Sequence, residues 1–225
     1  MKLKYLFWAL FLSSLSFCAC DILGEEEDGV ENDIPNNQNN EGSKQENEPS
    51  RGESGVSADA EVNAAFVLLN AMRNDPESYS TMVGFDLSGV KSLPSLKWNS
   101  ALAKVAQQKA DDMVKRGYFS HTDPDGYGVN YFINQAGYTL NPSWYSSKSL
   151  NYFESIAAGK QTGKQTIVQL VYDSGNANAN AGHRSHLLGI SEWNASLTDI
   201  GIGHAYGPNT QYKHYWSFII AKHDY

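Results

Sequence analysis

Apolar residues recur every three to four positions in four stretches of this chain, which is the spacing of an amphipathic helix. The stretches begin near residues 57 to 59, 99, 127 and 162. Asn99 and Thr162 are residue types that cap helix N-termini, and Gly117 and Gly137 are typical of helix ends. The pattern therefore predicts four helices, the first ending at about residue 75, before a proline.

Alternating positions predict strands near the end of the chain. Ile200, Ile202 and His204 alternate with glycines, and residues 215–221 form a run of β-branched and aromatic side chains. A Gly-Pro-Asn-Thr turn separates the two, so they are predicted to pair as an antiparallel hairpin. Residues 154–158 are a weaker strand candidate. Helices before and between few strands predict an α+β fold, with helices packed on an antiparallel sheet.

Charge divides the chain into two parts. Residues 21–60 hold 12 acidic and 2 basic side chains, whereas residues 61–225 hold 13 of each. The acidic segment has no periodic apolar face to bury, so residues 20–58 are predicted to be a disordered linker and residues 59–225 one folded domain. The domain is electrically neutral and has no basic stripe, which argues against nucleic acid as a ligand.

The first twenty residues have the pattern of an export signal. Two lysines precede an apolar run that leads to Phe17-Cys18-Ala19-Cys20. This sequence resembles a lipobox, in which the cysteine after a small residue is lipidated and becomes the mature N-terminus. Residues 1–19 are then a lipoprotein signal peptide and Cys20 carries the lipid. Ordinary signal-peptidase cleavage near Ala19 is the alternative.

The predicted anchor implies an exported protein on a bacterial membrane. The acidic cluster Glu25–Asp28 favours the outer membrane or cell surface over the inner membrane, whereas Asp21 resembles an inner-membrane retention signal. Both cysteines of the chain, Cys18 and Cys20, precede the predicted domain 59–225. The folded domain must therefore be held together by packing, without disulfides.

Six short motifs follow one another through the folded part. They are Asn70-x-x-Arg73; Leu96-Lys97-Trp98-Asn99 with Leu102-Ala103; Tyr118-Phe119-Ser120-His121 with Asp123-Pro124-Asp125-Gly126; Glu154-Ser155-Ile156-Ala157-Ala158-Gly159; Gly182-His183-Arg184 with Leu187-Leu188; and Asp199-Ile200-Gly201-Ile202-Gly203. In this order, over about residues 66–221, they resemble bacterial members of the CAP superfamily, the cysteine-rich secretory, antigen 5 and pathogenesis-related proteins. The resemblance implies an α-β-α sandwich with a small antiparallel sheet between helical layers.

The resemblance also implies a cavity that many members of the family line with two histidines and two glutamates, sometimes with a divalent metal between the histidines. Matched position by position, His121 is the first histidine, Glu154 the first glutamate and His183 the second histidine. The second glutamate is expected at about Ser174 and is missing. Asp173 is adjacent, but a shift of one residue turns a side chain by about 100° around a helix.

Two histidines and one carboxylate are suitable ligands for zinc. A divalent cation is therefore expected at His121 and His183, with Glu154 as a possible third ligand. The same three residues are candidate catalytic groups, because water bound to the metal can become a nucleophile. The sequence contains no His-Glu-x-x-His helix and no Gly-x-Ser-x-Gly elbow.

Three functions stay open at this point. The preferred one is a non-catalytic exported binding module whose cleft holds a small apolar ligand, a peptide or a glycan, because the second glutamate and a protein nucleophile are missing. The second is a metal-dependent, peptidase-like hydrolase that uses the same cleft. The third is a structural or adhesive surface protein in which the histidines only stabilise the fold.

Other polar residues are predicted to have structural roles. His186 is expected to be a hydrogen-bonded packing residue, and His204 a residue of a strand face or of the core. Arg73 and Arg184 are expected to pair with carboxylates or helix carbonyl groups near the core. The segment 123–126 is expected to form a turn, since too few oxygen ligands are present for a dedicated calcium site.

Overall fold

The computed structural model describes residue 57 and residues 59–175 and 182–223. The predicted signal peptide 1–19, Cys20 and nearly all of the predicted linker 20–58 lie outside the described residues. Within the described ranges, no helix is long and apolar enough to cross a membrane.

The helices confirm the four predicted ones and add shorter elements. The described α-helices are α1 (Ala60–Asn74), α2 (Ser80–Val83), α3 (Ser100–Arg116), α4 (Val129–Gln135), α5 (Gly163–Tyr172), α6 (Gly182–Leu188) and α7 (Glu192–Ala195), and the 3-10 turns are Glu77–Tyr79, Pro142–Tyr145 and Asp173–Gly175. The side chains of Asp59, Asn99 and Thr162 accept backbone N–H groups at the starts of α1, α3 and α5. Each such cap stabilises its helix by about 1 kcal/mol.

Four strands form one sheet. They are β1 (Lys97–Trp98), β2 (Glu154–Ala158), β3 (Asp199–Tyr206) and β4 (His214–Ala221), in the order β1-β3-β4-β2. The β3–β4 hairpin is the predicted one, and β2 also pairs antiparallel with β4. The sheet is mixed rather than purely antiparallel, because the two-residue β1 lies parallel to β3.

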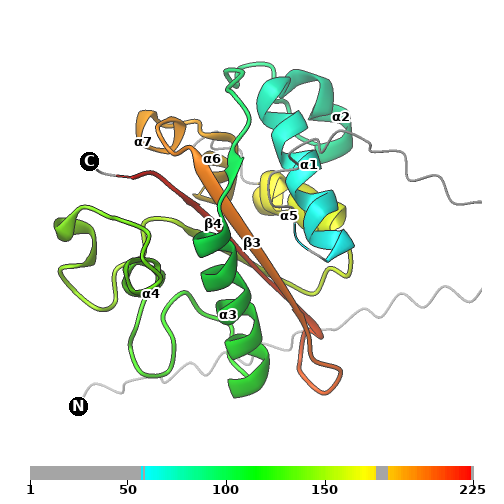
Figure 1. The fold of residues 1–225 in the computed structure, drawn as a ribbon. Coiled ribbons are helices and arrows are strands. Elements are labelled where there is room, and N and C mark those ends of the chain that lie inside the picture. The colour runs from blue at the N-terminus through cyan, green and yellow to red at the C-terminus, as the bar shows by residue number, and fades with distance from the viewer. Residues whose placement is uncertain (1–56, 58, 176–181, 224–225) are drawn as a thin grey trace, which may run out of the picture. The chain divides into compact units, whose positions relative to one another are not determined.

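Helix α3 covers one face of β3 and β4 (Figure 1). It approaches β3 closely because Gly201 and Gly203 face it. A Cβ atom at Gly201 would collide with the backbone of Leu102 and Ala103, and one at Gly203 with the backbone of α3 one turn later. The alternation of glycine and isoleucine in β3 therefore gives one face to the helix and the other to the core.

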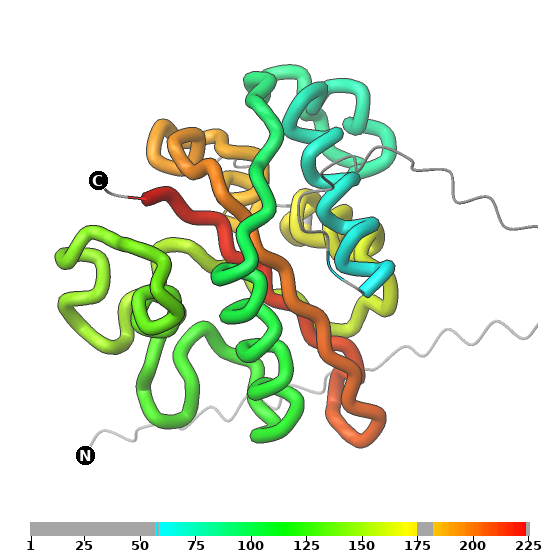
Figure 2. The backbone as a smooth tube through the Cα atoms, viewed as in Figure 1, coloured from blue at the N-terminus to red at the C-terminus, as the bar shows by residue number. Residues whose placement is uncertain are grey.

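Helices α1, α5 and α6 form the second helical layer. They contact one another and the strands, and the tube in Figure 2 shows α1 and α5 side by side. The strand side chains on this face are apolar and fully buried or nearly so: Ile200, Ile202, Trp216, Phe218 and Ile220. The architecture is the α-β-α sandwich that the resemblance implied.

Two buried arginines connect the helices of this layer, as predicted. Arg73 of α1 donates through Nη1 to the carbonyl oxygen of Leu187 in α6, at 2.8 Å. Arg184 of α6 donates to the carbonyl oxygens of Val171 and Tyr172 at the end of α5, both at 2.7 Å. Burial lowers the pKa of Arg73 to about 10, so it still carries its charge at neutral pH.

Candidate functional site

The candidate site lies at the edge of the sheet that β2 forms. Side chains of consecutive strand residues point to opposite faces, so Glu154 points to the α3 side and Ser155 to the α6 side. His121, in the loop after α3, contacts Glu154, and His186 of α6 contacts Ser155. β2 is an edge strand of the sheet. The loop after α3 contacts one of its faces and α6 the other, so segments far apart in the sequence meet at this strand.

His121 is oriented by a fully buried carboxylate. Its Nδ1 lies 3.0 Å from Oε2 of Glu154, whose side chain is 0% exposed, while the His121 side chain is 42% exposed. The second carboxylate oxygen, Oε1, accepts a hydrogen bond from Ser217 at 2.9 Å. Because a carboxylate only accepts hydrogen bonds, Nδ1 of His121 carries the proton, and the lone pair of Nε2 is available to coordinate a ligand.

Lys109 is a member of the site that the sequence analysis missed. Its buried ammonium group donates to the carbonyl oxygen of His121 at 2.9 Å and to the hydroxyl of Tyr118 at 3.2 Å. Burial lowers the pKa of Lys109, and the negative charge of Glu154 opposes that shift. The signal that could have identified Lys109 is its position on the apolar face of a predicted helix. Lys109 fixes the loop that carries His121.

His183 is oriented by Asp173 in the same way. Its Nδ1 lies 2.9 Å from Oδ1 of Asp173, and its side chain is 38% exposed. The other carboxylate oxygen, Oδ2, accepts the backbone N–H groups of His183 and Arg184 at 3.0 and 3.3 Å. Burial raises the pKa of Asp173, but the hydrogen bonds and charge of His183 outweigh it and hold the pKa below its ordinary value.

The helical offset of about 100° expected between Asp173 and Ser174 does not apply here. That expectation assumed that α5 continues, whereas α5 ends at Tyr172 and Asp173 has left-handed backbone angles, with φ 50° and ψ 50°. Ser174, the position expected for the second glutamate, is also left-handed, with φ 57°. The break in the helix turns Asp173 toward His183. Asp173 therefore supplies the carboxylate that pairs with the second histidine, and no glutamate is needed at position 174.

His186 lies close to both oriented histidines. It is buried, with Nδ1 2.8 Å from the hydroxyl of Ser155, and this confirms its predicted packing role. Burial lowers its pKa to about 4, and the charges of His183 and His121 act in the same direction.

His121 and His183 are the two oriented imidazoles of this site that could bind a cation. No three His, Cys, Asp or Glu side chains of the described residues form a group that can hold a metal ion. Oε2 of Glu154 pairs with His121 and Oε1 with Ser217, so this carboxylate orients His121. A carboxylate on Nδ1 and a free Nε2 are, however, the usual arrangement of metal-binding histidines.

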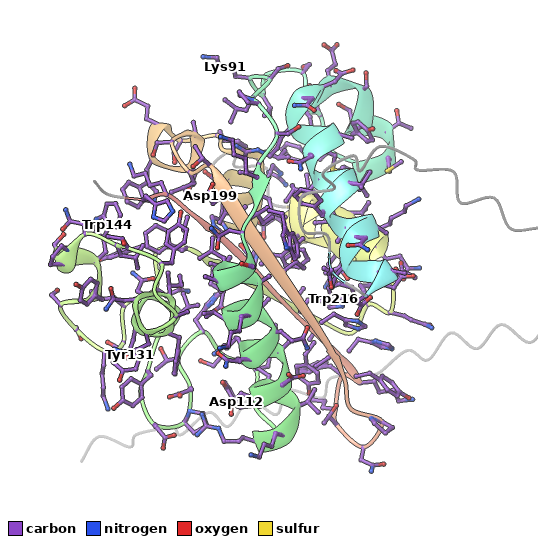
Figure 3. All side chains as sticks on the ribbon, viewed as in Figure 1. Lys91, Asp112, Tyr131, Trp144, Asp199 and Trp216 are labelled. Atoms are coloured by element: carbon purple, nitrogen blue, oxygen red, sulfur yellow. The ribbon has the colours of Figure 1, made fainter. Side chains whose placement is uncertain are left out.

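A cavity of about 500 Å³ opens beside His121. It lies between α3, α4 and the loop that joins them, and its lining includes Lys109, Tyr118, Phe132 and Asp112, which Figure 3 labels on α3. On its wall Arg116 pairs with three aspartates, Asp112, Asp123 and Asp125, at 2.8, 3.1 and 2.6 Å. The cavity therefore combines an apolar floor with polar groups that already have partners.

Two further predicted structural roles are confirmed. Oδ1 of Asp123 accepts the backbone N–H groups of Asp125 and Tyr127 at 2.9 and 2.8 Å, which makes 123–126 a turn. His204 stacks on Trp216 with ring centres 4.0 Å apart, on the packed face of β3. It is a packing residue, as predicted.

Comparisons with known proteins agree with this architecture. The family model described as the cysteine-rich secretory protein family, CAP, matches residues 66–220. No curated protein is similar enough to the chain to count as a match.

Several solved structures are similar. One is an extracellular protein with an SCP domain from Bacillus anthracis, at 20% identity, with 75% of this chain and 45% of that chain covered and a TM-score of 0.43. Another is an outer surface protein of Borrelia burgdorferi, at 16% identity, 75% and 97% coverage and a TM-score of 0.46. A third is venom allergen-like protein 4 of Schistosoma mansoni, at 16% identity, 72% and 86% coverage and a TM-score of 0.41.

This chain thus spans less than half the length of the Bacillus protein. The family model, in contrast, matches well over half of this chain, from the first long helix to the last strand. The matched range contains His121, Glu154, His183 and the residues that orient them, together called the histidine cleft. The chain belongs to the cysteine-rich secretory protein family, CAP.

Proposed function

We propose that this protein is an exported binding module, anchored to a bacterial membrane by a lipid on Cys20, and that its cleft at the β2 edge binds a small ligand beside a divalent cation. His121 and His183 would hold the cation through their Nε2 atoms. Water and the ligand would complete the coordination, because the described residues supply no third side chain.

One observation carries the choice of binding over hydrolysis. Every carboxylate oxygen next to the two histidines is already engaged: Oε1 and Oε2 of Glu154 with Ser217 and His121, and Oδ1 and Oδ2 of Asp173 with His183 and the start of α6. A metal-dependent hydrolase needs an acid or base that can exchange a proton with water in the site. Both acids here orient histidines instead.

Zinc titration by calorimetry tests the cation site. The wild-type domain is expected to bind one zinc ion, and the variant His121→Ala/His183→Ala to bind at least about 100-fold more weakly. The variant His204→Ala/His214→Ala removes two other histidines and serves as the matched control. Equal zinc affinity in all three proteins would show that the cleft histidines only stabilise the fold.

An activity screen separates binding from hydrolysis. Peptide and ester substrates are incubated with the zinc-loaded protein and with its Glu154→Gln variant. The proposal expects no turnover above the zinc-free control. Zinc-dependent turnover that Glu154→Gln abolishes would establish the hydrolase instead, and turnover that survives this substitution would rule out Glu154 as its catalytic acid.

The lipid anchor has its own test, and the two cysteines supply a matched pair. Cys20→Ala is expected to release the protein from the membrane fraction and to abolish incorporation of labelled palmitate, whereas Cys18→Ala is expected to change neither. Mass spectrometry of the mature N-terminus gives the direct readout. An unmodified amine at Cys20 would contradict the anchor.

A further inference from the structure

A second hollow of about 440 Å³ is lined by residues that follow α3 and by residues of the β3–β4 hairpin turn and the start of β4. Its volume falls within the range of roughly 300–1,000 Å³ of small-molecule sites. The residues that line it are Gly117, Tyr118, Phe119, Asn209, Thr210, Gln211, Tyr212 and Tyr215. None of these lining residues is charged, so its ligand is recognised without ion pairs.

Three aromatic rings form one wall of this hollow. The ring centres of Phe119 and Tyr212 are 5.7 Å apart, those of Tyr212 and Tyr215 6.0 Å, and those of Phe119 and Tyr215 6.4 Å. Tyr215 is buried, whereas Phe119 and Tyr212 are 41% and 39% exposed. The buried ring supports two rings that face solvent and are open to a ligand.

Two amide side chains stand beside the rings. Asn209 and Gln211 are exposed, and among the described residues neither side chain makes a hydrogen bond. An amide offers both donors and an acceptor. These two groups are therefore available to a ligand that presents hydroxyl groups.

The turn that carries the amides is held in place. The hydroxyl of Thr210 donates to the carbonyl oxygen of Gly207 at 2.7 Å and accepts the N–H group of Lys213 at 3.2 Å. The backbone N–H of Gly207 also donates to the carbonyl oxygen of Lys213 at 2.7 Å. A preorganised loop loses little conformational freedom on binding, which favours even a weakly interacting ligand.

From these observations we infer that the hollow lined by Phe119, Tyr212, Asn209 and Gln211 is a binding site for a neutral saccharide. The C–H groups of a sugar ring pack on aromatic faces, which carry partial negative charge. The sugar hydroxyls pair with the two amides. A nucleic acid base also stacks on aromatic rings but requires a positively charged groove for its phosphates, and this lining has no charge.

This site is distinct from the histidine cleft. Tyr118 lines both hollows, and His121 lines only the larger one. Saccharide binding therefore requires no cation, and it is expected to be unchanged in His121→Ala/His183→Ala. Failure of the cation proposal and failure of the saccharide proposal are thus separate results.

The experiment is a calorimetric titration with neutral trisaccharides built from glucose, mannose, galactose, xylose and N-acetylglucosamine. Each is used at up to about 10 mM, since a dissociation constant of that size is about the weakest that identifies a specific site. At least one is expected to bind the wild-type domain. Phe119→Ala/Tyr212→Ala is expected to weaken that binding at least about tenfold. Asn209→Ala/Gln211→Ala is expected to weaken it as well, and the second pair leaves the aromatic wall intact.

Tyr206→Ala is the matched control. Tyr206 is an exposed aromatic residue of the same hairpin, 57% exposed, and it does not line the hollow. Its substitution is expected to change affinity less than about twofold. The inference is overturned if no saccharide of the panel binds, if binding survives Phe119→Ala/Tyr212→Ala, or if Tyr206→Ala weakens it equally. Binding of an uncharged tripeptide instead of the sugars, with loss in the same variants, would assign the hollow to peptides and overturn the saccharide.

Discussion

The histidines of the cleft and those of the hairpin have opposite environments. His121 and His183 each have one nitrogen on a carboxylate and a side chain about two-fifths exposed. His204 has Nδ1 3.1 Å from Asp59 and Nε2 3.1 Å from His214, and its ring is stacked on Trp216. A carboxylate partner is thus common to both regions, and it is the state of the second nitrogen that differs.

This difference separates a binding role from a structural one. A histidine with both nitrogens satisfied inside the fold contributes to stability and has no atom left for a ligand. A histidine fixed through Nδ1 and open at Nε2 contributes less to stability and is ready to coordinate. Substitutions of the hairpin histidines should therefore lower stability and spare cation binding, and substitutions of His121 and His183 should do the reverse.

The largest expected effect concerns His186, which is buried beneath the cleft. Its pKa in the folded protein is about 4, whereas an unfolded chain binds the proton near pH 6.5. The unfolded state therefore holds more protons between these values, and stability is lost as the pH falls from 6.5 to 4, by on the order of 3 kcal/mol. Urea unfolding across this pH range measures it.

His186→Asn is the control for this pH dependence. The variant is expected to lose most of the stability change between pH 6.5 and 4, while a smaller change remains. That remainder is expected because burial and the neighbouring His204 also lower the pKa of His214. The same pH slope in the variant as in the wild type would assign the effect to other groups.

The next effect tests the two regions directly. His204→Ala is expected to cost about 2 kcal/mol of unfolding free energy, because it removes the ring stacked on Trp216 and leaves Asp59 and His214 without their partner. His121→Ala, on an exposed side chain, is expected to cost less than about 1 kcal/mol. Urea midpoints at pH 7 give both values, and equal losses would erase the distinction.

The smallest effect concerns the orienting carboxylates. Asp173→Asn keeps an oxygen for the start of α6 but weakens the hold on Nδ1 of His183, so zinc affinity is expected to fall about tenfold. Asp59→Asn makes the same change at the His204 pair and is expected to leave zinc affinity unaltered. An equal loss from both substitutions, measured by calorimetry, would mean that general charge rather than orientation acts on the metal.

Much of the fold was predictable because its long elements carry their own signals. The helices α1, α3 and α5 have capping residues and apolar periodicity, and β2 to β4 have β-branched or alternating residues. The two-residue β1 and the short α6 and α7 are too short to show a period, although Ser191 caps α7. β1 forms because the backbone N–H groups of Lys97 and Asn99 donate to the carbonyl oxygens of Thr198 and Ile200. These partners lie far along the chain, so no local signal indicates the strand.

Three residues of the candidate site were predictable, whereas their pairing and the role of Lys109 were not. Motif order pointed to His121, Glu154 and His183, whereas the role of Asp173 depends on a left-handed residue that ends α5. Nothing in local propensity requires a non-glycine residue there to adopt that conformation, which is rare and needs support from the surrounding structure. The hydrogen bonds to α6 provide that support.

Asp59 also has a mechanical consequence. It is the last residue before α1, its Oδ1 caps that helix, and its Oδ2 lies on His204 in the middle layer. If the preceding segment is the membrane tether, a pull on it first meets the hydrogen bond from Asn63 to the carbonyl oxygen of Ser57 and then Asp59. Asp59 then holds the start of α1 to the long strand β3, so a pull at this point loads both elements.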